Sequence, residues 1–520
     1  MPDMNQNRKK LPIGISSLSN IISEGFYYAD KTGMFANLIQ QGKYYFLSRP
    51  RRFGKSLMLD SIKEIFECNQ ALFQGLEIQD QWDWSCPHPV LRIDFSGDTL
   101  NSLEDLDASV KQQFDDYERQ FALPARYTDH RGRLRDLILR LHQQSGQTVV
   151  VLIDEYDKPI LDNIEQSELA QAIRNQLKTL YGVLKGLDAH LRFVMLTGVS
   201  KFSKVSLFSG LNNLKDITLD PAWSALCGYT EREVETVFAP ELEGLEREQI
   251  RRWYNGYNWR GEAVYNPFDL LLLFDRREFQ TWWFETGTPT FLTRLMAHSG
   301  FFTPELARME VGSELISSFD VDQITPEALL FQTGYLTIRS ARQLPSGPWA
   351  YTLGYPNLEV EISLNSHLLA AYTGDMRKSN RQRLQLEQML SRNDLTALQG
   401  LFQAFFASIP YHWFVNNPIA EYEGFYASVF YSYFAALGYE IVVEDATNHG
   451  RIDMTVKLPE RIYLFEFKVV ELQPEGAALQ QLQARAYADK YRNQGVPIVL
   501  VGVEFSRAGR NVLRFETATG

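Results

Sequence analysis

Residues 48–57 read Ser-Arg-Pro-Arg-Arg-Phe-Gly-Lys-Ser-Leu, and the organisation of the chain follows from this stretch. An apolar run at residues 44–47 precedes it, and apolar side chains at helical spacing follow it from Leu57 to Phe66. A strand, a tight loop and a helix form the setting that a phosphate-binding loop requires, because N–H groups of the loop and the helix N-terminus can surround an anion. The stretch therefore predicts a phosphate-binding loop, with a basic turn before a core helix as the simpler alternative.

Within this loop we assign nucleotide-binding roles to particular side chains. Lys55 is expected to reach the β- and γ-phosphates, and the Ser56 hydroxyl is expected to ligate Mg²⁺. Arg52 and Gly54 are included among the nucleotide-binding residues. The chain departs from the usual pattern at residues 49–50, where an arginine replaces the first glycine and a proline removes a backbone donor.

Length and composition limit the class of protein. At 520 residues the chain is too long for one core, and typical domain sizes suggest about three domains. The net charge of −12 argues against a generally basic nucleic-acid-binding surface but leaves a local basic groove open. Three cysteines lie far apart without a CxxC pair, which fits neither a zinc module nor a disulfide framework and indicates a reducing compartment.

The chain shows no sequence signal for membrane attachment. Residues 1–10 are polar and lack the apolar core of a signal peptide. No apolar run approaches the ~18 residues that cross a bilayer. We therefore expect a soluble cytoplasmic protein without a membrane partner.

A second motif strengthens the interpretation of the first. Residues 148–157 read Thr-Val-Val-Val-Leu-Ile-Asp-Glu-Tyr-Asp, a β-branched run typical of a strand that is buried on both faces. Ligands bind at the carboxyl ends of such strands. Asp154 is expected to hold Mg²⁺, and Glu155 to orient and polarise the attacking water. A strand that ends in solvated acids is the alternative, but the two motifs together predict an ATP site.

A third strand and a helical region follow. Residues 191–196 predict another buried strand, and Thr197 at its end is our candidate sensor of the γ-phosphate; an ordinary strand-end threonine is the alternative. Residues 221–395 are expected to form a helical lid and linker over the nucleotide. Arg251 and Arg252 could face that site or a partner, although aromatic and charged clusters of this kind more often form core and surface.

Acidic and basic residues gather again near the C-terminus. Residues 450–456 and 461–469 predict two strands, and pairing about the turn at 459–460 puts Asp453 opposite Glu466. Glu466 and Lys468 are two residues apart and therefore share a face. A slip of one residue in register would separate these groups.

Carboxylates in this arrangement suit Mg²⁺ or Mn²⁺. A metal held by Asp453 and Glu466 is expected to support phosphodiester cleavage, with Lys468 positioning water or steadying the transition-state charge. Glu423 could assist from the preceding helix. The alternative is a structural ion pair on a half-exposed sheet.

The first part of the chain resembles a known bacterial family. Residues 28–32 (Tyr-Ala-Asp-Lys-Thr), 48–56 and 153–157 are similar to the signature of the AAA-ATPase-like family. In that family the Arg-Pro-Arg-Arg-Phe loop is the usual form, so the arginine at position 49 is not a local defect. The resemblance implies a P-loop ATPase fold over residues 1–220.

The last part resembles the PD-(D/E)XK nuclease superfamily domain that is commonly fused to this family. The similarity lies in Glu423, in residues 444–453 and in Glu466-Phe467-Lys468. It implies a restriction-endonuclease-like core over residues 396–520. The expected fold class is therefore α/β: a P-loop NTPase sheet with a helical lid, plus a restriction-endonuclease-like α/β domain.

Together these features predict a P-loop ATPase coupled to a metal-dependent nuclease, a hydrolase acting on nucleic acid, with DNA favoured over RNA. A nucleotide-switched module that binds nucleic acid or protein without cleavage is the alternative, and a scaffold with vestigial sites is a third hypothesis. A homo-oligomer is compatible with the sequence, which assigns no arginine finger.

Overall fold

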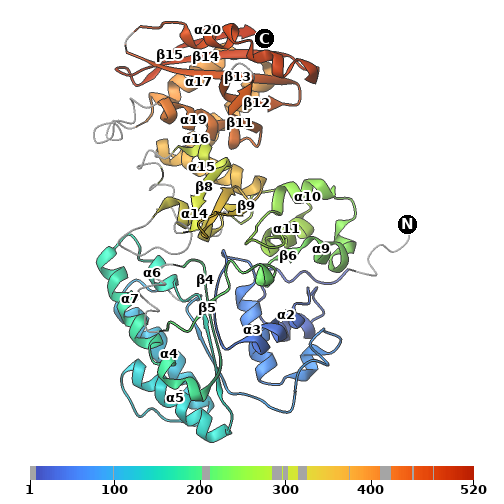
Figure 1. Ribbon diagram of the computed structural model, residues 1–520, viewed down its shortest axis with the longest axis vertical. Coiled ribbons are helices and arrows are strands. Elements are labelled where there is room, and N and C mark those ends of the chain that lie inside the picture. The colour runs from blue at the N-terminus through green and yellow to red at the C-terminus, as the bar shows by residue number, and fades with distance from the viewer. Residues whose placement is uncertain are drawn as a thin grey trace. The chain divides into compact units, whose positions relative to one another are not determined.

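The computed structural model describes residues 8–97, 99–201, 211–283, 296, 302–313, 325–373, 375–409, 423–447, 450–471 and 473–520. It contains two compact units, and each is assembled from separate parts of the chain. The first comprises Met1–Trp283 and Glu310–Asn357, and the second comprises Phe284–Met309 and Leu358–Gly520. The region expected as a lid and linker, residues 221–395, is therefore divided between them (Figure 1).

A five-stranded parallel sheet forms the core of the first unit. Its order is β2-β3-β4-β1-β5, which places β4 between the strand of the phosphate loop and the strand that ends in acids. β1 and β3 are buried along their whole length, as expected for β-branched and aromatic runs covered on both faces. The strands are β1 (Tyr44–Ser48), β2 (Val90–Asp94), β3 (Val149–Asp154), β4 (Leu191–Gly198) and β5 (Lys215–Asp216). The α/β prediction for this part is confirmed.

Helices connect these strands, and one of them protects the edge of the sheet. They are α1 (Leu18–Ser23), α2 (Thr32–Gln41), α3 (Lys55–Phe66), α4 (Leu103–Gln120), α5 (His130–Ser145), α6 (Lys158–Leu161) and α7 (Ser167–Tyr181). The Tyr117 hydroxyl of α4 accepts from the N–H of Arg92 and donates to its carbonyl, and Gln113 makes the same pair of bonds to Asp94. These side chains satisfy the outward backbone groups of the edge strand β2.

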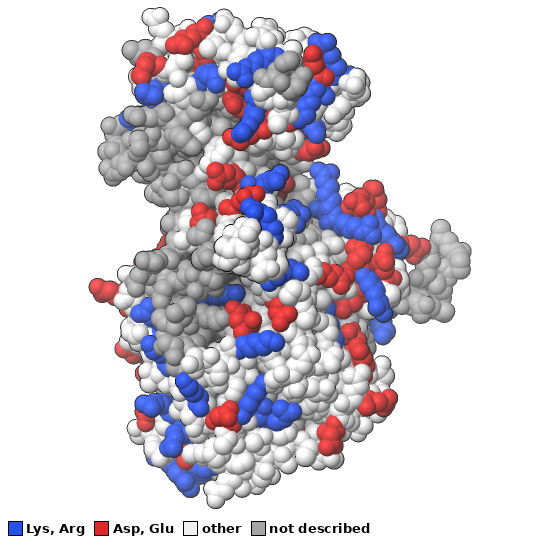
Figure 2. Space-filling model, in the orientation of Figure 1, with Lys and Arg blue, Asp and Glu red and all other residues white. Residues whose placement is uncertain are grey.

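Small strands and helices complete the elements before residue 358. They are β6 (Tyr229–Thr230), α9 (Glu231–Val237), α10 (Arg247–Tyr254), β7 (Val264–Tyr265), α11 (Pro267–Arg276), β8 (Met309–Gly312), α14 (Pro326–Thr333), β9 (Thr337–Gln343) and β10 (Trp349–Gly354). Acidic and basic side chains are intermixed over the visible face of the molecule (Figure 2).

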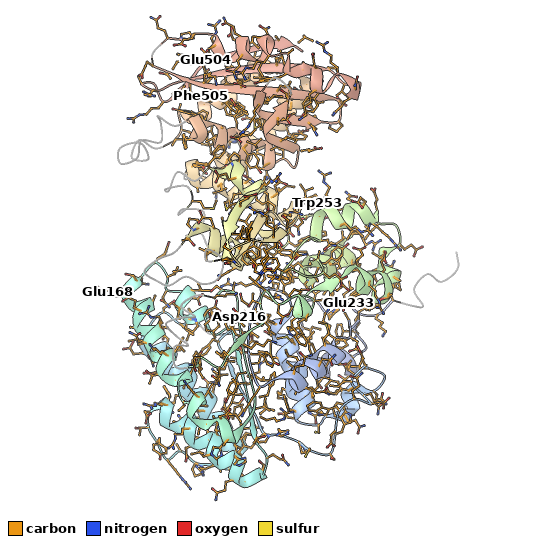
Figure 3. The ribbon with its side chains drawn as sticks, viewed as in Figure 1. Glu168, Asp216, Glu233, Trp253, Glu504 and Phe505 are labelled. Carbon is orange, nitrogen blue, oxygen red and sulfur yellow. The ribbon has the colours of Figure 1, made fainter. Side chains whose placement is uncertain are left out.

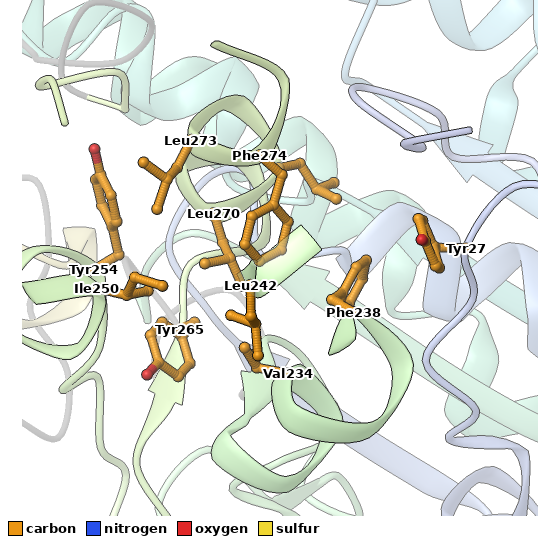
Figure 4. Close-up of a cluster of buried hydrophobic side chains, with 11 residues drawn as sticks. Tyr27, Val234, Phe238, Leu242, Ile250, Tyr254, Tyr265, Leu270, Leu273 and Phe274 are labelled. Atoms are coloured by element: carbon orange, nitrogen blue, oxygen red, sulfur yellow. The ribbon is translucent and has the colours of Figure 1, made fainter. Parts of the chain in front are cut away.

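Within the first unit, residues 27–31 fasten the α9–α11 region to the segment that leads into α2. Lys31 at the start of α2 forms a largely buried ion pair of 2.7 Å with Glu233 of α9 (Figure 3). Tyr27 packs against Phe238 within an apolar cluster that also contains residues of α10 and α11 (Figure 4). The helical region is therefore anchored both by charge and by apolar burial.

The second unit is a mixed sheet with helices on both faces. The strands are β11 (Glu440–Thr447), β12 (Gly450–Leu458), β13 (Arg461–Val470), β14 (Ile498–Ser506) and β15 (Asn511–Thr519), in that order across the sheet. β13 and β14 are parallel, and the other neighbouring pairs are antiparallel. The helices are α15 (Leu358–Thr373), α16 (Met376–Arg392), α17 (Leu395–Phe406), α19 (Glu423–Ala435) and α20 (Ala477–Ala484).

Alternation along β13 distributes its side chains between the two layers of helices. Phe465 and Phe467 meet Phe430 of α19. Leu464 packs with Leu482 of α20 in a separate cluster. The chain thus has this α/β domain in addition to the parallel-sheet unit, which confirms the predicted fold class. No helix in the described ranges is both long and apolar enough to cross a membrane.

Candidate active sites

The phosphate loop joins β1 directly to α3. Gly54 has φ +86° and occupies the N-cap position without a side-chain cap, so the first N–H groups of α3 have no partner within the helix. Lys55 is the first residue of this helix and is 4% exposed. Its ammonium donates to the carbonyls of Arg49 and Pro50, each at 3.0 Å. Ser56 follows in the same turn, half-buried.

Arg49 has a structural role in place of the usual glycine. Its guanidinium is fully buried and donates to the carbonyls of Ser48, Thr218 and Trp223 at 2.8–3.1 Å. It lies 4.0 Å from the centre of the Trp259 ring, a cation–π contact. Burial lowers the pKa of Arg49 to about 10, so the side chain stays charged near neutral pH. The residue therefore fastens the start of the loop to the chain that follows β5.

The remaining loop residues are held by the region after residue 223. The Trp283 indole N–H donates to the Arg51 carbonyl at 3.0 Å, and the Gly228 N–H donates to the Phe53 carbonyl at 3.1 Å. Phe53 packs edge-to-face on Tyr257. These contacts couple the conformation of the phosphate loop to this part of the first unit.

Two further contacts complete this attachment. Arg52 is exposed, has φ +69°, and lies over the Phe268 ring of α11 at 5.0 Å. A Cβ atom at Gly334 would lie 2.6 Å from Pro50, so the glycine allows α14 to approach the loop.

Asp154 lies at the end of β3 and is fully buried. The Thr197 hydroxyl from β4 donates to its Oδ1 at 2.8 Å, and the Arg92 guanidinium from β2 donates to its Oδ2 at 3.0 Å. Arg92 also lies 3.3 Å from Asp94 and 3.5 Å from Asp60 of α3. Side chains of β2 and β4 thus meet on the carboxylate of β3, and Asp60 of the loop helix joins them through Arg92.

Glu155 has a strained backbone and an altered acidity. Its φ of +50° is uncommon for a side chain of this size and turns the chain sharply after β3. Burial raises the pKa of Glu155 above its usual range, and the nearby Lys55 ammonium opposes that rise. The structure thus brings Lys55, Asp154, Glu155 and Thr197 together at the carboxyl ends of the strands.

Asp157 is a residue near this site to which the sequence assigned no role. It is fully buried and accepts from the N–H groups of Val199 and Ser200 and from the Ser200 hydroxyl. A Cβ atom at Gly198 would lie 2.5 Å from its Oδ1, so only glycine fits there. Asp157 therefore fixes the loop that leaves β4. Its place in the Asp-Glu-Tyr-Asp motif was the available signal.

Arg251 and Arg252, the two arginines expected to face either the nucleotide or a partner, both lie on α10. Arg251 of α10 pairs with Glu231 at 3.0 Å and lies 3.4 Å from Glu248. These partners raise the pKa of Arg251. Arg252 is exposed on the same helix. Neither has a described contact with the phosphate loop.

In the second unit, the turn at residues 459–460 sets the register of β12 and β13. Met454 pairs with Phe465, so Asp453 and Glu466 are next in line across the two strands. Asp453 accepts the Phe467 N–H through Oδ2 at 2.8 Å. Burial raises the pKa of Asp453, while this hydrogen bond and the Lys468 charge oppose the rise.

Glu466 is fully buried and lies within reach of two donors. Lys468 places its ammonium 3.4 Å from Oε1, and the Gln481 side-chain amide of α20 donates to the same oxygen. A Cβ atom at Gly502 would lie 2.8 Å from the Leu479 Cα, so the absence of a side chain lets α20 lie directly on β14. The sequence did not assign Gln481 a role. The glycine within the apolar run of β14 was the indirect signal.

Two further acids belong to the same unit. α19 begins at Glu423, whose side chain lies outside the described residues. Glu504 on β14 is 1% exposed and accepts the N–H groups of Glu475 and Ala477, which orders the entry into α20 (Figure 3).

Comparison with known proteins finds a match for each of the two parts of the chain that carry these residues. The family described as Predicted AAA-ATPase, AAA-ATPase-like, matches residues 12–208, and the PD-(D/E)XK nuclease superfamily matches residues 421–515. The chain is also 57% identical over 510 residues to the uncharacterized protein in the vnfD 5′ region of Azotobacter chroococcum mcd 1, covering 98% of this chain and 99% of that relative. The chain belongs to this family, which joins an AAA-ATPase-like domain to a PD-(D/E)XK nuclease superfamily domain. The predicted resemblance is confirmed.

The donor chemistry of both domains fits a divalent cation. The ATPase-like domain offers the Asp154 carboxylate and the Ser56 hydroxyl, and the nuclease-like domain offers Asp453 and Glu466. Within the described ranges, no group of three or more His, Cys, Asp or Glu side chains is placed to hold a metal. Mg²⁺ commonly uses only one or two carboxylates, with water and substrate phosphates as its other ligands, so a set of this size is compatible with its chemistry.

Proposed function

We propose that this protein hydrolyses ATP in its first unit and uses that cycle to control metal-dependent cleavage of DNA in its second unit. The observation that carries the proposal is the meeting of Lys55, Asp154 and Glu155 at one end of the parallel sheet. A cation, a buried carboxylate and a carboxyl of raised pKa are the groups that phosphoryl transfer to water requires.

In the ATPase-like domain, each residue has a separate task. Lys55 binds the β- and γ-phosphates, while Arg52 and the backbone at Gly54 face the entering anion. Glu155 accepts the proton of the attacking water, a role that its raised pKa favours. Thr197 contacts Asp154 directly and can thereby register the phosphate state.

In the nuclease-like domain, Asp453 and Glu466 would hold Mg²⁺ or Mn²⁺, and Asp154 with Ser56 would hold Mg²⁺ in the first unit. A cation at either site would supply Lewis-acid stabilisation of the charge on the reacting phosphate. Lys468 orients water and stabilises negative charge beside Glu466. Glu423 assists from the start of α19. DNA is the proposed substrate in preference to RNA.

One observation favours the second candidate, a nucleotide-switched binding module without cleavage. Oε1 of Glu466 already accepts from Gln481 and lies 3.4 Å from the Lys468 ammonium. A carboxylate held in this way is also a stable structural group. In that case the second unit would bind nucleic acid or a protein, and the nucleotide would switch the binding.

Measurement of DNA cleavage with Mg²⁺ or Mn²⁺, with and without ATP, separates these candidates. Lys55→Ala should lower ATP hydrolysis by about 10²-fold or more and remove the effect of ATP on cleavage. Asp453→Ala should abolish cleavage and leave ATP hydrolysis intact.

One matched control lies on the same helix as Lys55, and the other lies on the strand that pairs with the strand of Asp453. Lys63→Ala changes an ion-paired lysine two turns further along α3, and Glu440→Gln changes an exposed acid on β11 that pairs with Lys457. Both should behave as the wild type. Cleavage by Asp453→Ala at the wild-type rate would overturn the nuclease assignment. Binding without cleavage in either metal would favour the second candidate.

A further inference from the structure

One face of α16 carries a row of exposed basic and amide side chains. At 100° per residue, the positions i, i+4, i+8, i+11 and i+15 fall within one sector of a helix. The exposed side chains at these positions are Arg377, Arg381, Gln385, Gln388 and Arg392, with Lys378 at the margin. Leu384, which is 61% exposed, lies on the same face.

The opposite face of α16 fixes this helix in the second unit. Leu386 and Leu390 are buried, and Gln382 accepts from the Tyr433 hydroxyl of α19 at 3.1 Å. Asn393 at the C-terminal end accepts from the Tyr463 hydroxyl of β13 at 3.0 Å. The basic face is therefore presented by a helix that the nuclease-like sheet holds in place (Figure 1).

The charges on this face differ from those elsewhere in the second unit. Within the described part of the chain, Arg377, Lys378, Arg381 and Arg392 take part in no ion pair. The nuclease-like domain, in contrast, pairs most of its solvent-accessible basic side chains: Lys457–Glu440, Arg451–Glu444, Lys490–Asp445, Arg492–Asp489, Arg507–Glu471 and Arg514–Glu516.

Helix electrostatics disfavours this arrangement. Arg377 and Lys378 occupy the first turn, where the helix dipole repels cations. Arg377 and Arg381 are a like-charged i,i+4 pair, which destabilises an isolated helix. In a chain with net charge −12, a negatively charged partner would compensate these repulsions.

We propose that the α16 basic face binds the phosphate backbone of duplex DNA. This inference rests on the proposed function and adds the surface that receives the substrate. Arginine and glutamine donate to phosphate oxygens, and the span from Arg377 to Arg392 is about 22 Å, or about six base pairs.

Duplex DNA fits this face better than single-stranded RNA does. Recognition of single strands depends on aromatic side chains that stack on bases, and the face presents none.

The test compares two triple variants that remove the same charge. Arg377→Gln, Arg381→Gln and Arg392→Gln together change the face. Arg451→Gln, Arg492→Gln and Arg507→Gln together change three ion-paired arginines of the same unit. Binding of a fluorescent 20-base-pair duplex is measured with Ca²⁺ in place of Mg²⁺, at several salt concentrations, and each variant is also checked by thermal melting.

We expect the face variant to bind at least tenfold more weakly and to lower the slope of log K against log salt by about 2 to 3, since each lost phosphate contact contributes about 0.9. The control variant should stay within about threefold of the wild type. Both should melt near the wild-type temperature, because every changed side chain is solvent-accessible.

The outcomes separate this surface from the proposed function. If the wild type binds DNA and the face variant has the same affinity and salt slope, the assignment of DNA binding to α16 is wrong, and the proposed function is unaffected. A wild type that hydrolyses ATP but binds no duplex would overturn both the surface and the nuclease proposal. Preferential binding of single-stranded RNA, or a change in oligomeric state caused by the face variant, would overturn the assignment to duplex DNA.

Discussion

Arg92 connects the strand edge, the loop helix and the buried acid of the ATPase-like domain. Its guanidinium contacts Asp154, Asp94 and Asp60, and its own backbone is held by the Tyr117 hydroxyl. A buried carboxylate needs a cation or several donors to remain charged. Arg92 therefore acts as a positioning residue for Asp154.

Replacement of this arginine should affect stability and activity together. Arg92→Ala leaves the Asp154 charge with only the Thr197 hydroxyl and should lower the free energy of unfolding by about 3 kcal/mol. ATP hydrolysis should fall as well. Denaturant unfolding and ATPase assays measure both effects, and Arg92→Lys should recover part of each because it restores the charge.

Arg192 provides the control for that substitution. It lies on β4 over the Phe66 ring, at 6.0 Å. Arg192→Ala should lower the free energy of unfolding much less, because it leaves no buried carboxylate without a cationic partner. Equal losses in Arg92→Ala and Arg192→Ala would contradict the positioning role.

Glu155 carries a predicted trade-off between stability and activity. Its raised pKa means that the folded protein binds the proton more tightly than the unfolded chain does, so the ionised side chain costs stability above that pKa. Glu155→Gln should therefore raise the thermal midpoint at pH 8, and the gain should shrink as the pH falls through the raised pKa. ATP hydrolysis should drop by about 10²- to 10⁴-fold. A gain in thermal midpoint that increases as the pH falls would contradict this prediction.

At the scale of elements, close packing of α20 on β14 places Gln481 beside Glu466. Gly502 makes this possible, because any side chain there would meet the backbone of Leu479. The nuclease-like site thus depends on a helix whose position is set by the absence of one methyl group.

Gly502→Ala should therefore displace α20, lower stability by about 1–3 kcal/mol and reduce cleavage. Gly400→Ala in α17 is the matched control: nothing lies within 4 Å of its added Cβ atom, and helix propensity predicts a gain of about 0.5–1 kcal/mol. Unfolding in urea measures both. Equal stability changes in the two variants would contradict the packing argument.

At the scale of the whole molecule, two compact units share one chain. ATP binds only the first in our proposal, so ligand linkage should stabilise that unit alone. Differential scanning calorimetry should show two transitions, and Mg²⁺ with ATP at a hundredfold excess over Kd should stabilise one by about 2.7 kcal/mol. Lys55→Ala should remove the shift. A single transition, or an equal shift of both transitions, would contradict the selective stabilisation of the first unit.

Local patterns in the sequence determined the main elements of this protein and much of its candidate chemistry. Lys55 and the Asp154–Glu155 pair could be placed together because parallel strands end at a common edge of a sheet. Asp453 and Glu466 could be aligned because a turn at residues 459–460 sets the hairpin register. Both inferences need only periodicity, turn chemistry and neighbouring strands.

The tertiary structure alone decided which distant residues complete these sites. Arg92 reaches Asp154 because β2 lies beside β3, and Gln481 reaches Glu466 because α20 lies on Gly502. Arg49 departs from the usual loop pattern, and its buried contacts with Thr218, Trp223 and Trp259 explain it. Strand order and helix docking arise from packing between segments far apart in the chain, which no local pattern encodes.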